Sequence, residues 1–421
     1  MASLKVHGTV AVPGDKSISH RALILGALAT GETRITGILD SADVRSTCHV
    51  LTGLGAEIPD LASEMILTGV GLKGLKRSQR SLDCGNSGTT TRLMAGVAAA
   101  YPFLSTFEGD ASLSRRPMRR IADPLTSMGA RFEFARGDGL PMTVTGGSLR
   151  PVDWNTGGSS AQVKSAILLA AVVAGVEVRV VEKALSRDHT ERMLRAMGVD
   201  IVSVDNEVVA RSASGLEAIP VEVPADPSSA AFFVALATLA DRGELRIPDV
   251  CLNPTRTGFF RVLKTMGADI SEVDVRSVGG EDIGTLVVRP AELGGASIDE
   301  HEIGSMIDEL PLLACVAAAA QVELTVRGAG ELRVKESDRI NAVVENLRAV
   351  GATADESPDG LHVAPGSRTL AGTIDSRADH RIAMSFGVLG RLAGNNIEVR
   401  DRDCVNISFP KFWSELARVT E

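Results

Sequence analysis

Residues 13–29 read P-G-D-K-S-I-S-H-R-A-L-I-L-G-A-L-A, a polar turn followed by an apolar, alanine-rich helix. The first helical residues supply two positive charges and two hydroxyls, at Lys16, Ser17, Ser19 and Arg21. A helix N-terminus carries unpaired N–H groups and partial positive charge, so this start favours binding of a phosphate or carboxylate. A capped surface helix with solvated charges is the alternative. Because Asp15 precedes Lys16, the stretch does not fit the nucleotide-binding pattern G-x-x-x-x-G-K-[ST].

The same arrangement recurs along the chain, which indicates internal repeats. Apolar, alanine-rich helices are predicted at six places: 22–29, 91–100, 161–174, 229–240, 310–320 and 382–393. Most of them lead through a glycine into a short alternating strand, and then into an amphipathic helix that ends in a motif such as L-T-S-M-G-A. The glycines that close these helices are expected in the left-handed conformation, and they are Gly55, Gly129, Gly198, Gly267 and Gly351. Chance similarity is the alternative, and the matching helix ends argue against it.

Each repeat is therefore read as helix, strand, helix and one or two further strands, which predicts an α/β protein with mixed sheets. The stretch V-E-V-P-A-D-P-S-S at 221–229 carries two prolines near the midpoint of the chain. Such a stretch is typical of a crossing between domains. We expect three repeats on each side of it.

Composition limits the classes of partner. The 421 residues are 44% apolar, 23% charged and only 3% aromatic, with a formal charge of −9. Few aromatic side chains and net negative charge argue against nucleic-acid and membrane partners. The five cysteines are scattered and form no C-x-x-C pair, as expected for a reduced cytoplasm. The start of the chain shows no secretory signal, and apolar runs such as 312–320 are too short to span a membrane.

Polar residues gather where the repeated helices are expected to start. The relevant stretches are D-C-G-N-S-G-T-T-T-R at 83–92, R-R-P-M-R-R at 115–120, G-G-S-S-A-Q at 157–162, I-D-E-L-P at 307–311, L-R-V-K-E-S-D-R at 332–339 and A-D-H-R at 378–381. Taken singly, each is equally explained by a turn, a helix cap or a solvated surface. Taken together, they predict a cleft for two or more small anions, with Asp308 and Glu336 as candidate proton-transfer groups. No histidine or cysteine cluster has the spacing of a metal site.

These motifs resemble, in order and spacing and over essentially the whole chain, the family of 5-enolpyruvylshikimate-3-phosphate synthases. The resemblance implies two domains of three repeats each, an inside-out α/β barrel architecture. The domains would be 14–225 and 1–13 plus 226–421, with hinge crossings near 13–15 and 223–227. It implies transfer of the enolpyruvyl group of phosphoenolpyruvate to the 5-hydroxyl of shikimate 3-phosphate by addition and elimination, with release of phosphate. No cofactor and no metal are expected, and the reaction serves chorismate and aromatic amino acid biosynthesis.

The resemblance also implies roles for single residues. The expected catalytic residues are Asp308 as the base at the 5-hydroxyl, Glu336 in proton transfer at the methylene carbon, Lys16 and Lys335. Shikimate 3-phosphate is expected to contact Lys16, Ser17, Arg21, Ser160, Gln162, Arg187, Asp308 and Lys335. Phosphoenolpyruvate is expected to contact Lys16, Gly88, Arg116, Gln162, Arg339 and Arg381. The inhibitor glyphosate is expected to compete for the phosphoenolpyruvate site, and the protein is expected to be a cytoplasmic monomer.

Some positions depart from the commonest pattern of the family. Ala161 stands where many members have serine, Glu331 where asparagine is frequent, and Asn406 and Ile407 where a lysine is frequent. One phosphoenolpyruvate contact is therefore in question. Two alternatives remain: the sister enolpyruvyl transferase that acts on UDP-N-acetylglucosamine, and a non-catalytic anion-binding repeat protein. The first begins with Lys-Asn and uses a loop cysteine, whereas Ser17 follows Lys16 here and the loop at Arg115 has no cysteine.

Overall fold

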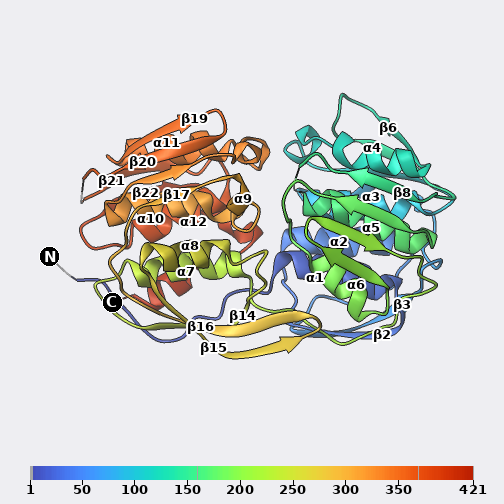
Figure 1. Cartoon of the computed structure of the whole chain (residues 1–421), viewed down its shortest axis with the longest axis horizontal. Helices are drawn as coiled ribbons and strands as arrows, with labels where there is room; N and C mark the ends of the chain where they lie inside the picture. Colours follow the sequence, from blue (N-terminus) through green and yellow to red (C-terminus); the bar gives the residue numbers. More distant parts are fainter. Residues whose placement is uncertain (1–2, 159, 368, 421) are drawn as a thin grey trace. The chain divides into compact units, whose positions relative to one another are not determined.

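The computed structural model describes residues 3–158, 160–367 and 369–420, which form two compact units (Figure 1). The first compact unit comprises Gly14–Val223 and Ser277–Glu281, and the second comprises the other described residues. The chain therefore passes between the units after residues 13, 223, 276 and 281. The sequence did not predict the second pair of crossings. Each unit is described by itself below.

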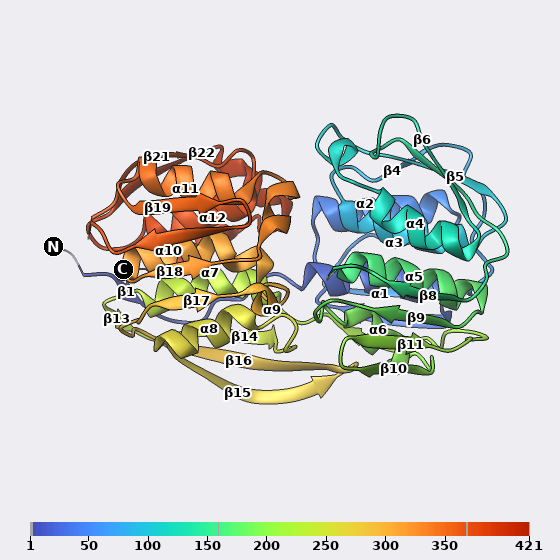
Figure 2. The ribbon, with the colours of Figure 1, turned by 45° about the horizontal axis from the view of Figure 1, so that its top comes forward.

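The first compact unit is built from three helix pairs. Its apolar helices are α1 (Lys16–Leu28), α3 (Gly88–Ala99) and α5 (Ala161–Ala174), and its second helices are α2 (Ala42–Gly53), α4 (Arg119–Met128) and α6 (His189–Ala196). The apolar helices are buried over almost all of their residues. Helices α3 and α5 pack closely, because a Cβ atom at Gly96 would lie 2.3 Å from the carbonyl oxygen of Ala166. Figure 2 shows α1, α3 and α5 inside this unit.

Three mixed sheets accompany these helices. Their strand orders are β12 (Val221–Glu222)-β2 (Thr30–Thr36)-β3 (Glu64–Val70), β4 (Leu82–Asp83)-β5 (Leu104–Glu108)-β7 (Met142–Thr145)-β6 (Arg131–Phe134), and β10 (Ile201–Val204)-β11 (Glu207–Ala210)-β9 (Val178–Val181)-β8 (Val152–Asn155). In each sheet the strand that follows the apolar helix has one parallel and one antiparallel neighbour. A short 3-10 turn, η1 (Leu113–Arg115), precedes α4. The repeated mixed α/β unit predicted from the sequence is confirmed.

The second compact unit repeats this plan. Its apolar helices are α7 (Pro227–Thr238), α10 (Leu310–Ala320) and α12 (His380–Leu389), and its second helices are α8 (Gly258–Met266), α11 (Arg339–Ala349) and α13 (Phe412–Arg418). Short helical turns precede three of the longer helices: α9 (Glu300–Ile303) with η2 (Ile307–Glu309), η3 (Gly330–Val334) and η4 (Arg402–Ile407). Every residue of α7 and α12 is buried, so these two helices form the centre of the apolar core.

The sheets of the second unit are less uniform. Their orders are β14 (Leu245–Cys251)-β16 (Glu281–Arg289)-β15 (Asp269–Val278), β17 (Ala296–Ile298)-β18 (Leu324–Val326)-β20 (Gly360–Ala364)-β19 (Thr353–Ser357), β21 (Ala371–Asp375)-β22 (Asn396–Arg400) and β1 (Lys5–Val6)-β13 (Arg242–Gly243). Strand β1, at the start of the chain, pairs in parallel with β13.

The glycines predicted to close the second helices have positive φ in all five cases. Their φ values are +86° at Gly55, +120° at Gly129, +92° at Gly198, +114° at Gly267 and +94° at Gly351. Only glycine adopts this conformation without a steric cost, which explains why the helix-end motif recurs. Across the part of the chain that the structure describes, every helix is too short or too polar to cross a lipid bilayer.

Candidate active site

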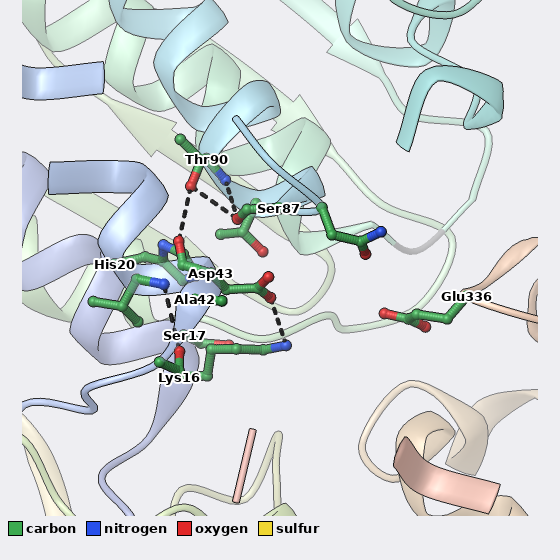
Figure 3. Close-up of polar contacts among 12 residues, drawn as sticks. Lys16, Ser17, His20, Ala42, Asp43, Ser87, Thr90 and Glu336 are labelled. Atoms are coloured by element: carbon green, nitrogen blue, oxygen red, sulfur yellow. Dashed lines mark hydrogen bonds and ion pairs between the residues drawn. The ribbon is translucent and has the colours of Figure 1, made fainter. Parts of the chain in front are cut away.

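The start of α1 carries the first group of expected site residues. Asp15 caps the helix, because its Oδ1 accepts a hydrogen bond of 2.8 Å from the backbone N–H of Ile18. Lys16 is therefore the first helical residue, and its Nζ lies 3.0 Å from Oδ2 of Asp43 in α2 (Figure 3). The side chain of Lys16 keeps 24% of its surface exposed, so this ammonium remains accessible while it is paired.

Ser17 and Arg21 connect α1 to the neighbouring helices of the same unit. Nη1 of Arg21 donates to the carbonyl oxygen of Ser17 at 2.9 Å, and its other nitrogens donate to Thr190 at 2.6 Å and Ser165 at 2.7 Å. Nη1 of Arg187 lies 3.5 Å from Oγ of Ser17. The guanidinium of Arg21 is thus buried in a polar seam, whereas Arg187 is only partly buried.

The start of α3 brings a second group together. Ser87 caps this helix by accepting from the backbone N–H of Thr90. A Cβ atom at Gly88 would lie 3.4 Å from Nη1 of both Arg116 and Arg92. Nη2 of Arg116 donates to the side-chain oxygen of Asn86 at 2.7 Å. Two guanidinium groups therefore converge on the backbone at Gly88, and the missing side chain leaves that backbone open to them.

Gln162 and Ser160 lie at the start of α5. Oε1 of Gln162 accepts from Nη1 of Arg92 at 2.5 Å, and its Nε2 donates to Thr89 at 3.0 Å. This pair of bonds links the starts of α3 and α5. Ser160 occupies the N-cap position of α5, where its side chain makes no capping hydrogen bond.

A buried chain of hydroxyl groups lies behind these helix starts. Nδ1 of His20 is 2.7 Å from Oγ1 of Thr47, which is 2.7 Å from Oγ1 of Thr90. Oγ1 of Thr90 in turn donates to Oγ of Ser87 at 2.8 Å (Figure 3). Burial lowers the pKa of His20 to about 3, although Asp43 opposes this shift, so the imidazole is neutral at pH 7. The chain fixes α1, α2 and α3 relative to one another.

In the second compact unit, the guanidinium of Arg339 is a hub for carboxylates. Its Nε lies 2.8 Å from Oδ2 of Asp379, its Nη1 lies 3.0 Å from Oδ1 of Asp308, and its Nη2 lies 2.7 Å from Oε2 of Glu336. Arg339 is the first residue of α11, and Asp379 caps α12 by accepting from the backbone N–H of Arg381. Both candidate proton-transfer groups therefore meet at one buried cation.

Burial and charge oppose each other in this cluster. Burial by itself would lower the pKa of Arg339, but the charges of Asp379, Glu336 and Asp308 together raise it above its usual value. The guanidinium therefore stays charged. Burial would raise the pKa of Asp379, but the charge of Arg339 holds it below its usual range. The side chain of Arg339 is 2% exposed, whereas those of Asp308 and Glu336 are 15% and 27% exposed. The carboxylates of Asp308 and Glu336, the two outer carboxylates of the cluster, are thus accessible to a ligand.

Arg381 and Lys335 complete this group. Nη1 of Arg381 donates to Oε1 of Glu309 at 3.1 Å. Burial is the main cause that raises the pKa of Glu309, and Arg381 opposes it. Nζ of Lys335 lies 3.9 Å from Oε1 of Glu331, the residue that departs from the common asparagine.

The alternative interpretation of Asp308 and Glu309 as a helix cap finds little support. Glu309 does occupy the N-cap position of α10, but its side chain makes no capping hydrogen bond. Asp308 pairs with Arg339 instead. Within the described residues, no group of three or more histidine, cysteine, aspartate or glutamate side chains is placed to hold a metal ion.

Sequence reasoning missed the residues that hold the site residues. The sequence motifs indicated no role for Arg92 or Asp43, and Asp379 was equally explained by a helix cap. The signal for Asp43 was weak, because an acidic residue in the first turn of a helix is ordinarily explained by the helix dipole.

Comparison with known proteins shows the family to which this chain belongs. Residues 2–416 match the family model described as EPSP synthase (3-phosphoshikimate 1-carboxyvinyltransferase). The 3-phosphoshikimate 1-carboxyvinyltransferase of Persephonella marina is 46% identical, over 99% of this chain and 97% of its own. That of Synechococcus sp. strain JA-3-3Ab is 48% identical, over 98% and 94%. The solved EPSP synthase of Acinetobacter baumannii superposes with a TM-score of 0.88 at 38% identity, covering 100% of this chain and 98% of that one.

A more distant structure shares the fold alone. The enolpyruvyl transferase NikO from Streptomyces tendae superposes with a TM-score of 0.73 at 17% identity, covering 100% of this chain and 98% of that one. The two-unit architecture is therefore common to enolpyruvyl transferases that differ widely in sequence.

Proposed function

Since this chain belongs to the EPSP synthase family, we propose a division of its reaction among the residues described above. The enzyme transfers the enolpyruvyl group of phosphoenolpyruvate to the 5-hydroxyl of shikimate 3-phosphate and releases phosphate. In the addition step, the hydroxyl oxygen bonds to C2 of phosphoenolpyruvate, a base removes the hydroxyl proton, and an acid protonates C3. In the elimination step, the C2–phosphate bond breaks and C3 loses a proton, which restores the enol ether.

Shikimate 3-phosphate is proposed to bind mainly at the starts of α1 and α5 and at the segment that precedes α6. Lys16, Ser17, Ser160 and Arg187 supply an ammonium, two hydroxyls and a guanidinium, which suit a phosphate and a carboxylate. Arg21 is proposed to assist by its charge and through Ser17, whose carbonyl oxygen it holds. Gln162, Asp308 and Lys335 are proposed to contact the same substrate.

Phosphoenolpyruvate is proposed to bind the backbone at Gly88 and the side chains of Lys16, Arg116, Gln162, Arg339 and Arg381. The convergence of Arg116 and Arg92 on Gly88 supports this assignment. Arg92 is added to the proposal as the residue that holds Gln162.

Proton transfer is proposed to divide between the two outer carboxylates of the Arg339 hub. Asp308 would take the proton of the 5-hydroxyl, and Glu336 would act at C3 with help from Lys16, while Lys335 binds near the hydroxyl. The single observation that carries this proposal is the pairing of both carboxylates with Arg339. A fixed cation orients each carboxylate until substrate enters.

Deuterium uptake tests this assignment. Turnover in D₂O places deuterium on C3 when addition is reversible, and the label is read by NMR in recovered phosphoenolpyruvate and in product. Glu336→Gln should slow uptake by about 10²-fold or more. The matched control is Glu345→Gln. Glu345 lies on the same helix as Arg339, and its exposed carboxylate pairs with Arg377. Normal uptake in Glu336→Gln would contradict the role given to Glu336.

Three further properties belong to the proposal. Glyphosate is proposed to compete with phosphoenolpyruvate near Gly88. The protein is proposed to act as a monomer and to reside in the cytoplasm, where its five cysteines would stay reduced. Inhibition kinetics and light scattering check the first two.

A further inference from the structure

The first compact unit contains a group of buried charges that the proposed reaction does not use: Lys164, Glu182 and Glu191. Nζ of Lys164, on α5, lies 2.7 Å from Oε2 of Glu182 and 2.8 Å from Oε1 of Glu191, on α6. All three side chains are almost fully buried, at 1–2% exposure. Isolating such charges from water is costly unless they are paired, so a group of three at one point needs a reason.

The charges in this triad are unevenly matched. Burial alone would lower the pKa of Lys164, but the two glutamates raise it, so the ammonium is retained. Burial raises the pKa of Glu191 despite the opposing charge of Lys164, and its Oε2 has no hydrogen-bond partner among the described residues. Glu182, by contrast, is fully engaged. The triad therefore combines one cation with two carboxylates in unlike environments. It contacts the segment that joins β9 to α6, and Glu182 is itself part of this segment.

Glu182 and Lys164 hold that segment directly. Oε1 of Glu182 accepts from Oγ of Ser186 at 2.6 Å, and its Oε2 accepts from the backbone N–H of Ser186 at 3.3 Å. Nζ of Lys164 lies 3.5 Å from the carbonyl oxygen of Ser186. The backbone on both sides of Ser186 is thus bound to the triad, although Leu185 beside it is 57% exposed.

Arg187 is the next residue in the chain. Its Nη1 is 3.5 Å from Oγ of Ser17, at the start of α1. A second link joins α5 to α6 beside the triad. Oγ of Ser165 on α5 lies 2.7 Å from Oγ1 of Thr190 on α6, and Arg21 donates to both hydroxyls. Lys164 and Ser165 therefore fix α5 to α6 side by side, and the segment that carries Arg187 starts from this fixed point.

We propose that Lys164 is a positioning residue for shikimate 3-phosphate. Together with Glu182 and Glu191 it holds the segment 182–188 through Ser186, and so sets the place of Arg187 against the start of α1. The inference rests on the proposed contact between Arg187 and this substrate. Lys164 itself touches no reacting atom.

The test measures the Kd of shikimate 3-phosphate by titration calorimetry. Arg187→Ala should raise Kd about 10- to 100-fold, as expected for loss of a charged hydrogen bond. The triad is removed as a whole by combining Lys164→Met, Glu182→Gln and Glu191→Gln, which leaves no buried charge unpaired. Ser186→Ala removes only the hydroxyl link to Glu182. The triad variant and Ser186→Ala should each raise Kd about 3- to 10-fold, because each partly weakens the proposed hydrogen bond from Arg187 to shikimate 3-phosphate. The kcat and the KM for phosphoenolpyruvate should stay within about twofold of wild type.

The control is Lys73→Met, because Lys73 donates to the carbonyl oxygen of Val173 at the other end of α5. It should leave Kd unchanged. In the Arg187→Ala background, the triad variant should cause no further loss, since its effect runs through Arg187. If the triad variant does not fold, as judged by circular dichroism, Ser186→Ala decides alone.

Two results would overturn the inference while leaving the proposed function intact. One is a wild-type Kd in the folded triad variant or in Ser186→Ala, with Arg187→Ala impaired. The other is an equal loss from the triad variant with and without Arg187. A wild-type Kd in Arg187→Ala would instead contradict the role proposed for Arg187, and the premise of the inference with it.

Discussion

Replacing Asp308 by alanine separates a proton-transfer role from a structural one. Asp308 is 15% exposed and pairs with Arg339 at 3.0 Å, so the change removes one of the carboxylates around that guanidinium. Glu336 and Asp379 remain at 2.7 and 2.8 Å, so Arg339 stays paired after the change. The lost charged hydrogen bond is worth at most about 1.5 to 3 kcal/mol of unfolding free energy. Relief of repulsion among the remaining carboxylates offsets part of it.

The kinetic effect is expected to be larger and of another kind. Loss of a positioned base lowers kcat by about 10² to 10⁴-fold, which corresponds to about 3 to 5 kcal/mol in the activation barrier. The assay is phosphate release at saturating concentrations of both substrates, with the Kd of shikimate 3-phosphate measured beside it. We expect kcat to fall by that factor while Kd changes little.

The matched control is Asp299→Ala. Asp299 caps the short helix α9 by accepting from the backbone N–H of His301 at 3.0 Å, and it has no proposed role in the reaction. Its loss should cost about 1 kcal/mol of stability and leave kcat unchanged. A kcat for Asp308→Ala within threefold of wild type would refute the assignment of Asp308 as the base.

Two further predictions concern the first compact unit. Gly88→Ala places a Cβ atom 3.4 Å from Nη1 of Arg116 and of Arg92, and Arg92 is held by Gln162. Because the added methyl group narrows the proposed glyphosate site, the inhibition constant of glyphosate should rise about 10-fold. An unchanged constant would place the inhibitor elsewhere. The pKa of His20 is about 3 when folded and near 6.5 when unfolded, so the unfolded chain binds the extra proton as pH falls below 6.5. Wild type should therefore lose about 2 kcal/mol more stability than His20→Gln between pH 6.5 and 4.5, measured by urea unfolding; parallel pH profiles would contradict the buried neutral imidazole.

The helix starts could be predicted from the sequence because their signals are local. A capping residue, a run of apolar residues and a closing glycine each act within a few positions. The positive φ of Gly129 and Gly267 was therefore predictable, as was the position of α10 at Leu310–Ala320. Periodicity and turn chemistry need no knowledge of distant contacts.

The partners of the site residues could not be predicted in this way. Asp43 pairs with Lys16 from the next helix, and Asp379 pairs with Arg339 across 40 positions of the chain. The sequence predicted a cleft for small anions, but it did not indicate that Lys16, Arg339 and Arg381 each pair with a carboxylate. The buried triad at Lys164 was missed for the same reason, since its members come from α5, α6 and the segment that precedes α6.

The most direct test of the central claim is a product assay with two competing acceptors. The purified protein is treated with a chelator and incubated with phosphoenolpyruvate and either shikimate 3-phosphate or UDP-N-acetylglucosamine, and the products are followed by phosphate release and ³¹P NMR. We predict stoichiometric phosphate and enolpyruvyl product with shikimate 3-phosphate, and neither with the UDP-sugar. Turnover with the UDP-sugar alone, or with neither acceptor, would contradict the account.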